Sequence, residues 1–212
     1  MMNLKTLALF IILCGAMQTA IAQEFYGGLL AGFNGSQIEG DRASGYNKIG
    51  FVGGAWVQRD LSEKVFAAME LKYNQKGSRI NPTKNNGYRK YVYRLNYIDL
   101  PVLAGYILNN DFRFFGGCSF GVLVNKYGFD NYSTDPTVLY NGTKNWDLNM
   151  IAGMKVNLPR LVDRYWAEKF TLDLRLQLSM LSIVGEGLFY NPYTFNQYNN
   201  LISFTLFYRV EI

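Results

Sequence analysis

The sequence predicts an all-β fold: an eight-stranded antiparallel up-and-down transmembrane β-barrel with four long external loops and short periplasmic turns. Three observations support this prediction. Eight β-like segments follow the N-terminal region, polar and apolar residues alternate along several of them, and the connections between them alternate in length. Among the 212 residues, the 16 Tyr, 15 Phe and 21 Gly favour strands and suit a barrel with aromatic girdles.

The N-terminal region has the pattern of an export signal. Lys5 provides a positive charge, residues 7–13 form an apolar run too short to span a bilayer as a helix, and an A-x-A cleavage motif ends at Ala22. We therefore expect residues 1–22 to be a cleaved signal peptide. Residues 23–212 are then expected to form a single barrel domain in the bacterial outer membrane.

The eight predicted strands are long for a globular protein. Their expected spans are residues 24–34, 46–59, 64–78, 90–108, 111–125, 145–157, 168–182 and 198–211. Globular strands usually have about five or six residues, whereas a tilted strand needs about ten to cross a bilayer. The lengths therefore favour strands that cross a membrane.

The connections between the predicted strands sort by length. Long, polar connections are expected at residues 35–45, 79–89, 126–144 and 183–197, and shorter ones at residues 60–63, 109–110 and 158–167. If the N-terminus lies in the periplasm, all the long connections are external and all the short ones are periplasmic. Outer-membrane barrels have this asymmetry, and a soluble β-sandwich has no reason to have it.

Alternation within the strands predicts which face is the inside. In the segment 169–180 (KFTLDLRLQLSM) every second residue is apolar, so the other face of the strand carries Asp173 and Arg175. A soluble barrel would bury the apolar face, but a membrane barrel turns it toward lipid. Because the export signal, the connections and the strand lengths favour a membrane barrel, we predict that the charges face the lumen. Pro101 marks a place in the fourth strand where the alternation can switch.

Two sets of residues follow from this assignment. The predicted lumen charge network contains Glu70, Lys72, Asp147, Lys155, Asp173, Arg175, Arg209 and Glu211. The predicted lipid-facing side chains are Leu148, Met150, Leu172, Leu174, Leu176, Leu178, Phe204, Leu206 and Tyr208. Charges in the lumen need partners, and a set that mixes both signs allows salt bridges. Eight strands enclose little open space, so these side chains are expected to fill the lumen and leave no wide pore.

Three stretches carry a resemblance to a known family: SGYNKIGFVGGAWVQRDLSEK, MELKYNQKGS and YRLNYIDLPVLAGY, of which residues 95–106 are the most specific. They resemble the PorT-like outer-membrane β-barrel family of Bacteroidetes-type bacteria, over nearly the whole mature chain. The resemblance implies an eight-stranded outer-membrane barrel and, through one founding member, a link to type IX secretion and gliding. Most members have no known biochemical role. The chain also ends in Ile212, whereas many outer-membrane proteins end in Phe.

The composition excludes several classes of function. The chain has no His, which excludes Ser-His-Asp and Cys-His catalysis and the usual His-based zinc sites. A carboxylate pair such as Asp130 and Asp135 remains, in a loop that could hold calcium but whose residues are also ordinary turn residues. The formal net charge of +5 is mildly basic and no Lys/Arg run occurs, so no nucleic-acid partner is expected. We predict no cofactor and no metal.

We therefore expect a non-enzymatic outer-membrane barrel with a structural or accessory role in the cell envelope. Its expected partners are outer-membrane lipid and, through the external loops, other envelope or secretion proteins; the link to secretion rests on resemblance alone. One alternative is a soluble lipocalin-like periplasmic protein that binds a small apolar ligand, which requires the face of Leu172, Leu174 and Leu176 to point inward. A less favoured alternative is a lipid-modifying barrel enzyme.

Overall fold

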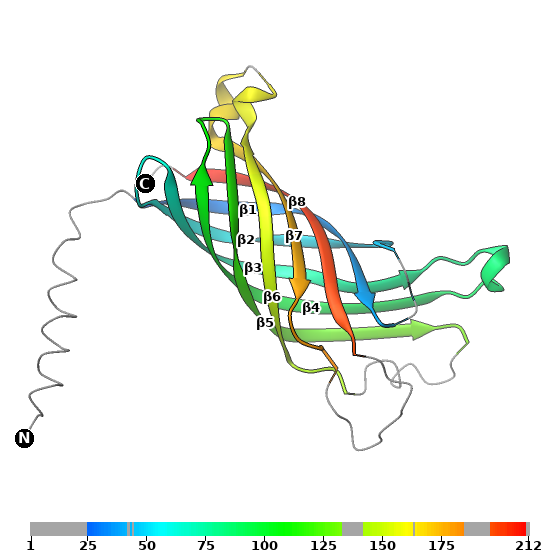
Figure 1. Cartoon of the computed structure of the whole chain (residues 1–212). Coiled ribbons are helices and arrows are strands. Elements are labelled where there is room, and N and C mark those ends of the chain that lie inside the picture. The colour runs from blue at the N-terminus through cyan, green and yellow to red at the C-terminus, as the bar shows by residue number, and fades with distance from the viewer. Residues whose placement is uncertain are drawn as a thin grey trace, which may run out of the picture.

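The chain folds into a closed barrel of eight antiparallel strands in this computed structural model, which describes residues 25–41, 43, 45–132, 142–162, 164–184 and 196–210. The strands are β1 (Phe25–Glu39), β2 (Lys48–Asp60), β3 (Val65–Ile80), β4 (Tyr91–Ile107), β5 (Phe112–Asp130), β6 (Trp146–Asn157), β7 (Phe170–Ser179) and β8 (Tyr198–Val210) (Figure 1). The predicted eight-stranded barrel is confirmed, and each strand begins and ends within five residues of its expected bounds. The expected signal peptide lies outside the described residues.

The barrel closes because its first and last strands pair with each other. β1 lies antiparallel to β8, from Gly27 opposite Val210 to Glu39 opposite Tyr198, and every strand is antiparallel to its sequence neighbour. These closed ladders leave no free sheet edge around the barrel wall, so backbone donors and acceptors pair within the chain. In the described part of the chain, no helix is both long and apolar enough to cross a membrane.

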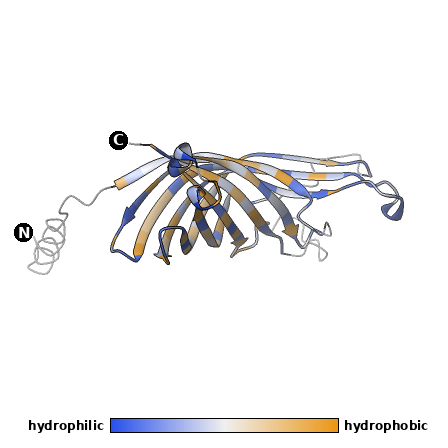
Figure 2. Cartoon of the chain, turned by 90° about the horizontal axis from the view of Figure 1, so that it is seen from above, coloured by the Kyte–Doolittle hydropathy of each residue, from blue (hydrophilic) through white to orange (hydrophobic). Residues whose placement is uncertain are grey.

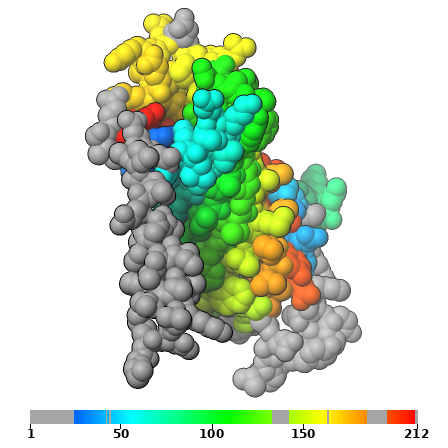
Figure 3. Space-filling view, turned by 60° about the vertical axis from the view of Figure 1, so that its left-hand side comes forward, coloured from blue at the N-terminus to red at the C-terminus, as the bar shows by residue number. Residues whose placement is uncertain are grey.

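One end of the barrel holds the three connections that follow β2, β4 and β6, and the end of β8 lies beside them (Figures 1 and 3). We call this the turn end and the opposite end the loop end. The connections 61–64 and 108–111 are short, as expected, but the connection 158–169 is longer than the connection 40–47 at the loop end. The predicted sorting of the connections by length is therefore not confirmed.

The local sequence explains the long third connection. It contains two 3-10 helices, η3 (Leu158–Arg160) and η4 (Tyr165–Lys169), and Pro159 lies in the first turn of η3. Proline has no backbone N–H and its φ angle suits the start of a helix. The β6 ladder therefore ends at Asn157, and the chain makes a compact excursion before β7.

Side chains alternate between the lumen and the outer wall along the strands. In β3, Glu70, Lys72 and Asn74 are buried, whereas Met69 and Leu71, on either side of Glu70 in the sequence, are exposed. Figure 2 shows the same pattern, with hydrophobic and hydrophilic residues following one another along the strands. The barrel is thus polar in much of its interior and apolar on its outer wall.

The alternation does not switch at Pro101. Along β4, odd-numbered residues remain buried from residue 91 to residue 103, with Pro101 among them. The irregularity lies in β5, where the register with β4 shifts and leaves Val124 without a partner residue. Beyond this bulge the buried residues of β5 are Gly128 and Asp130. The change of face that was expected in the fourth strand, near Pro101, therefore occurs in the fifth strand.

Three strands continue past the barrel at the loop end. Pairing of β3 with β2 stops at Asn74 and pairing of β5 with β6 stops at Val122, whereas β4 pairs with both β3 and β5 as far as Tyr91. We call residues 77–94 and 123–132 the hairpin extension. It projects beyond the other strands in Figure 1.

Gly77 permits a close approach of β3 to β4 at the base of the extension. Its φ angle is +133°, and a Cβ atom on it would lie 1.9 Å from the carbonyl oxygen of Tyr93. Both the backbone angle and the contact exclude an unstrained side chain. Gly116 differs, because a Cβ atom there would lie 3.6 Å from its nearest neighbour, the carbonyl oxygen of Ile151.

We predict that Gly77→Ala lowers the free energy of unfolding by about 1–3 kcal/mol, because alanine is strained at this angle and displaces β4. Urea unfolding in detergent micelles, followed by Trp fluorescence, measures the change. Gly116→Ala is the matched control and should leave stability unchanged or raise it by up to about 1 kcal/mol. Equal stability of the two variants would show that the backbone around Gly77 relaxes freely.

Candidate functional site: the polar lumen

An apolar layer fills the lumen toward the turn end. Its buried members form two clusters: Phe66, Ala68, Leu103, Phe115 and Ile151 in one, and Leu30, Val52 and Phe207 in the other, with Trp56 packed against the second. Rings and aliphatic chains from most of the strands meet there. A small barrel is filled by such packing, so this layer separates the turn end from the polar residues beyond it.

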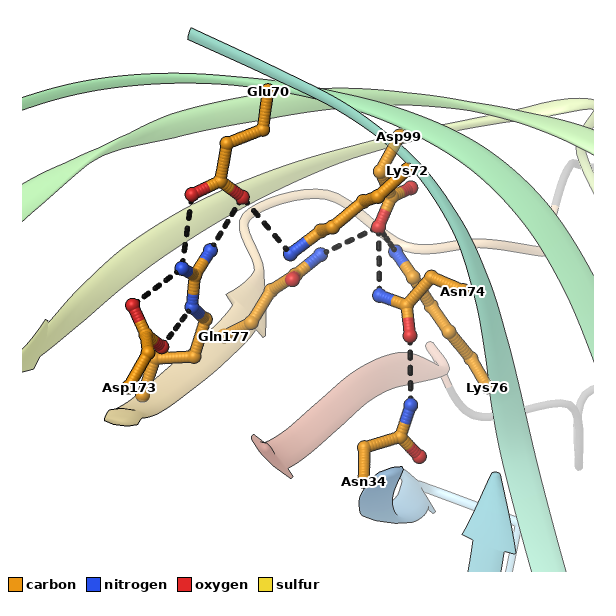
Figure 4. A network of polar contacts seen from close by, with 9 residues as sticks. Asn34, Glu70, Lys72, Asn74, Lys76, Asp99, Asp173 and Gln177 are labelled. Carbon is orange, nitrogen blue, oxygen red and sulfur yellow. Dashed lines mark hydrogen bonds and ion pairs between the residues drawn. The ribbon is translucent and has the colours of Figure 1, made fainter. Parts of the chain in front are cut away.

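Arg175 is the centre of the first polar cluster. Its guanidinium donates to both carboxylate oxygens of Glu70 on β3, at 2.8 and 3.0 Å, and to both of Asp173 on β7, at 2.7 and 2.6 Å. The three side chains are 2% exposed or less. Figure 4 labels the Glu70 and Asp173 side chains and marks the contacts that their carboxylates accept. Paired, hydrogen-bonded charges of this kind are the form in which a narrow lumen tolerates ions.

Lys76 is the centre of a second cluster, closer to the loop end. Its ammonium lies 3.3 Å from Asp99 on β4 and 3.0 Å from Asp147 on β6. Asp99 also accepts hydrogen bonds from Asn74 at 2.8 Å and Gln177 at 3.1 Å. Asn34 donates to Asn74 at 2.7 Å, which extends the network to β1 (Figure 4). Ser179 and Asn199 donate to Asp147 at 2.7 and 3.0 Å.

Lys72 and Lys155 are two further buried cations of the polar region. Lys72 lies 3.8 Å from Glu70, and Lys155 places its ammonium 4.0 Å from the ring centroid of Phe207 in the apolar layer. A cation over an aromatic face gains electrostatic attraction from the ring. Both lysines are therefore accommodated inside the barrel, one beside a carboxylate and the other against an aromatic ring.

Aromatic side chains cover the network toward the loop end. Tyr91, Tyr93, Leu95 and Tyr97 of β4 are buried and form one cluster with Ile38, Ala43 and Ile183. The ring of Tyr97 lies 4.5 Å from the Lys76 ammonium. Apolar and aromatic side chains thus lie on both sides of the charges along the barrel axis.

Most of the predicted charge set lies in this lumen, but one member does not join the network. Arg209 is exposed near the end of β8, where its guanidinium lies 4.5 Å from the ring of Tyr26. It lines a small cavity of about 80 Å³ at the turn end with Arg113 and Glu168. Arg209 follows the inward alternation of β8, but the lumen is already open to solvent at this level. The expectation of a network partner was therefore wrong here. Glu211 lies outside the described residues.

Sequence reasoning missed Lys76 and Asp99. Lys76 continues the alternation of Glu70, Lys72 and Asn74 along β3, so the period of two could have identified it. Asp99 was hidden by the expected switch near Pro101. With the alternation unbroken through β4, Asp99 faces inward.

The predicted lipid-facing residues all lie on the outer wall. Met150, Leu174, Leu176, Leu178, Phe204, Leu206 and Tyr208 are exposed, and Leu148 and Leu172 are half-buried. The lipocalin-like alternative required the leucine row of β7 to line the interior. Asp173, Arg175 and Gln177 occupy that position instead, which contradicts it.

The remaining candidates for chemistry have other partners. In the described residues, no group of three or more His, Cys, Asp or Glu side chains could hold a metal ion. Asp130 binds Arg89 at 2.6 Å, and Asp135 lies outside the described residues. The lumen carboxylates contact cations and amides, so the geometry supports structural roles for them.

We predict that Arg175→Ala lowers the free energy of unfolding by about 3–5 kcal/mol, because it leaves two buried carboxylates without their cation. Urea unfolding in micelles measures the loss. Arg160→Ala is the control, since Arg160 and Asp111 form an exposed pair at 3.9 Å, and its effect should stay below about 1 kcal/mol. Equal effects of the two substitutions would contradict the central role of Arg175.

Comparisons with known proteins agree with this architecture. Residues 18–185 match the family described as outer membrane protein beta-barrel domain. No curated protein matches the chain in sequence.

Solved structures of similar fold include Ail, the attachment invasion locus protein of Yersinia pestis, in complex with the heparin analogue sucrose octasulfate. It has 9% identity over 88% of this chain and 99% of that chain, with a TM-score of 0.48. Neisserial surface protein A has 10% identity over 89% and 97%, also with a TM-score of 0.48. At such values the likeness has no bearing on ligands. The family match covers most of the chain, so the chain belongs to the outer membrane protein beta-barrel domain family and is located in the bacterial outer membrane.

Proposed function

We propose that this chain is a non-enzymatic barrel with a side-chain-filled lumen, and that its role in the cell envelope is structural or accessory. The observation that supports this most is Arg175, which is 2% exposed and joins Glu70 and Asp173 across the lumen. A solute would have to break these contacts and displace the apolar layer in order to pass. Function then falls to the external loops and the outer wall.

We propose that residues 1–22 direct export and are then removed. The support is the A-x-A motif that ends at Ala22 behind a short apolar run. With the mature N-terminus in the periplasm, the turn end is periplasmic and the loop end is external. The loop end then offers its connections to other envelope proteins.

We also propose that the chain is a PorT-like protein of a Bacteroidetes-type bacterium. Residues 95–106 (LNYIDLPVLAGY) support this most, and they include Tyr97 and Asp99 of the polar lumen. A role in type IX secretion or gliding rests on that sequence resemblance alone, because one fold hosts many functions.

A lipid-modifying activity is not part of the proposal. Such an enzyme needs an activated nucleophile or a base, and the chain has no His. The buried carboxylates of Glu70 and Asp173 are both engaged by Arg175. The polar residues of the lumen therefore suit a role in stabilising the barrel better than a catalytic role.

We assign the outward side chains of β6, β7 and β8 to the lipid contact of the barrel. Leu174 is central in this wall, because it pairs with Met154 on one side and Phe204 on the other. Aliphatic and aromatic side chains of this kind form the lipid-facing band of outer-membrane barrels.

We predict that Leu174→Arg impairs folding into lipid bilayers, at a cost of about 2–4 kcal/mol if the residue lies near the midplane. Folding into vesicles, followed by the mobility of unheated samples on gels, measures the loss. Leu161→Arg is the matched control, since Leu161 is exposed in the connection 158–169, and it should fold normally. Normal folding of Leu174→Arg would place this wall outside the hydrocarbon.

Two measurements test the proposed function. Purified protein in planar lipid bilayers should give no steady conductance, because the lumen is filled; a stable open channel would contradict the proposal. Cross-linking in native membranes, followed by mass spectrometry, should recover envelope proteins attached to the external connections. Recovery of the chain without any protein partner would count against an accessory role.

A further inference from the structure

The basic charge of the chain is concentrated in the hairpin extension. This region holds six of the 21 basic residues, at Arg79, Lys84, Arg89, Lys90, Arg94 and Lys126, and one of the 16 acidic residues, Asp130. The rest of the chain has 15 basic and 15 acidic residues. The whole formal net charge of +5 therefore equals the charge of this one projecting element.

Most of these cations have no anion beside them. Arg89 binds Asp130, but among the described residues no ion pair involves Arg79, Lys84, Lys90 or Arg94. Arg79 and Arg94 are exposed and lie on the same face of the hairpin, because Arg79 pairs with Val92 and Arg94 with Gly77. Like charges held this close repel one another, so the arrangement favours an anionic ligand.

The connection between β3 and β4 is bonded to the residues at and just after the end of β5. Arg89 contacts Asp130 at 2.6 Å, and the Asn131 side chain accepts from the Lys90 backbone at 2.7 Å and donates to the Tyr88 carbonyl at 3.1 Å. Tyr132 donates its hydroxyl to the carbonyl of Gly87. A surface that is ordered before binding loses less entropy when a ligand arrives.

Tyr88 adds backbone strain to this connection. Its φ angle is +59°, the only positive value for a non-glycine residue in the described part of the chain, and it follows Gly87 at +63°. A non-glycine residue in this region costs about 1–3 kcal/mol and persists only where the surroundings enforce it. Such strain is concentrated at binding sites, and the Tyr88 ring is exposed.

An open cavity of about 720 Å³ lies between the hairpin extension and the connection after β1. Arg79 and Arg89 line it together with the polar residues Asn47, Asn81 and Tyr132, and none of the described residues that line it is a carboxylate. Ligand sites typically enclose about 300–1,000 Å³. The hydrogen bonds to Asp130 raise the pKa of the Arg89 guanidinium. The Nη1 group of Arg89 has no hydrogen-bond partner among the described residues.

We infer that this cavity binds a sugar that carries phosphate groups, with Arg79 and Arg89 as the contacts to phosphate. A guanidinium matches phosphate oxygens with two parallel hydrogen bonds. Several cations along the extension suit a ligand with more than one phosphate, and the amide and hydroxyl groups suit sugar hydroxyls. Such a ligand is available as the headgroup of an outer-leaflet glycolipid or as a soluble glycan.

The test uses the full barrel and a glucosamine disaccharide with two phosphates, compared with the same disaccharide without phosphate. The probes are offered free in solution and as the corresponding glycolipids in nanodiscs. Arg79→Gln should weaken binding of the phosphorylated probe about tenfold, the loss expected for one charged hydrogen-bonding contact. Lys64→Gln is the control, since it removes the same charge from an exposed residue at the turn end.

The outcomes separate the possibilities. Binding of the phosphorylated glycolipid alone supports the site and assigns it to the membrane, and binding of the free disaccharide as well supports a soluble source. Equal binding of the probe without phosphate overturns the inference. It is also overturned if Arg79→Gln binds like the unaltered protein, or if Lys64→Gln weakens binding as much. The mobility of unheated protein on gels shows that each variant is folded.

Discussion

Lipid offers no partners for backbone groups, so closure of the ladder between β1 and β8 is the constraint on which the rest of the structure depends. Closure divides every strand into a wall side and a lumen side. Eight strands enclose a narrow space, so polar side chains on the lumen side lie away from bulk water and need one another as partners. The paired charges of the lumen are a consequence of closing a small barrel with this alternation.

The two polar clusters meet this requirement with different cations. Arg175 has a planar group that engages two carboxylates through paired hydrogen bonds, and it lies beside them in the middle of the barrel. Lys76 has a compact ammonium, and it lies between carboxylates from β4 and β6 with amides around them. Both clusters cross the lumen and join strands that are not neighbours in the wall. They therefore resist collapse or shear of the barrel in a way that the ladders alone do not.

The hairpin extension departs from this balance. Inside the barrel each carboxylate has a cation or a donor beside it, whereas the extension carries most of its cations without anions. Its connection is nevertheless well supported, through Asp130, Asn131 and Tyr132. The chain thus combines a barrel whose buried carboxylates are paired with a projection whose cations mostly have no anion beside them. The barrel supplies the support, and the projection supplies the surface that an external partner can reach.

The sequence by itself determined the strands, because the period of two in segments such as KFTLDLRLQLSM is a local property of β structure. The same period placed Glu70, Lys72, Asp173 and Arg175 on inward positions. It failed where position along the barrel mattered: Arg209 points inward by alternation but lies where the lumen opens.

Only the tertiary structure decided which charges meet. Glu70 and Arg175 are 105 residues apart in the chain, and their contact depends on how far each strand is shifted along its neighbours around the whole barrel. The bulge at Val124 shifts the register of β5 against β4, and the unbroken alternation at Pro101 keeps Asp99 inside the barrel. Neither can be derived from a local pattern. Local periodicity selects the face of each side chain, whereas closure and register select its partner.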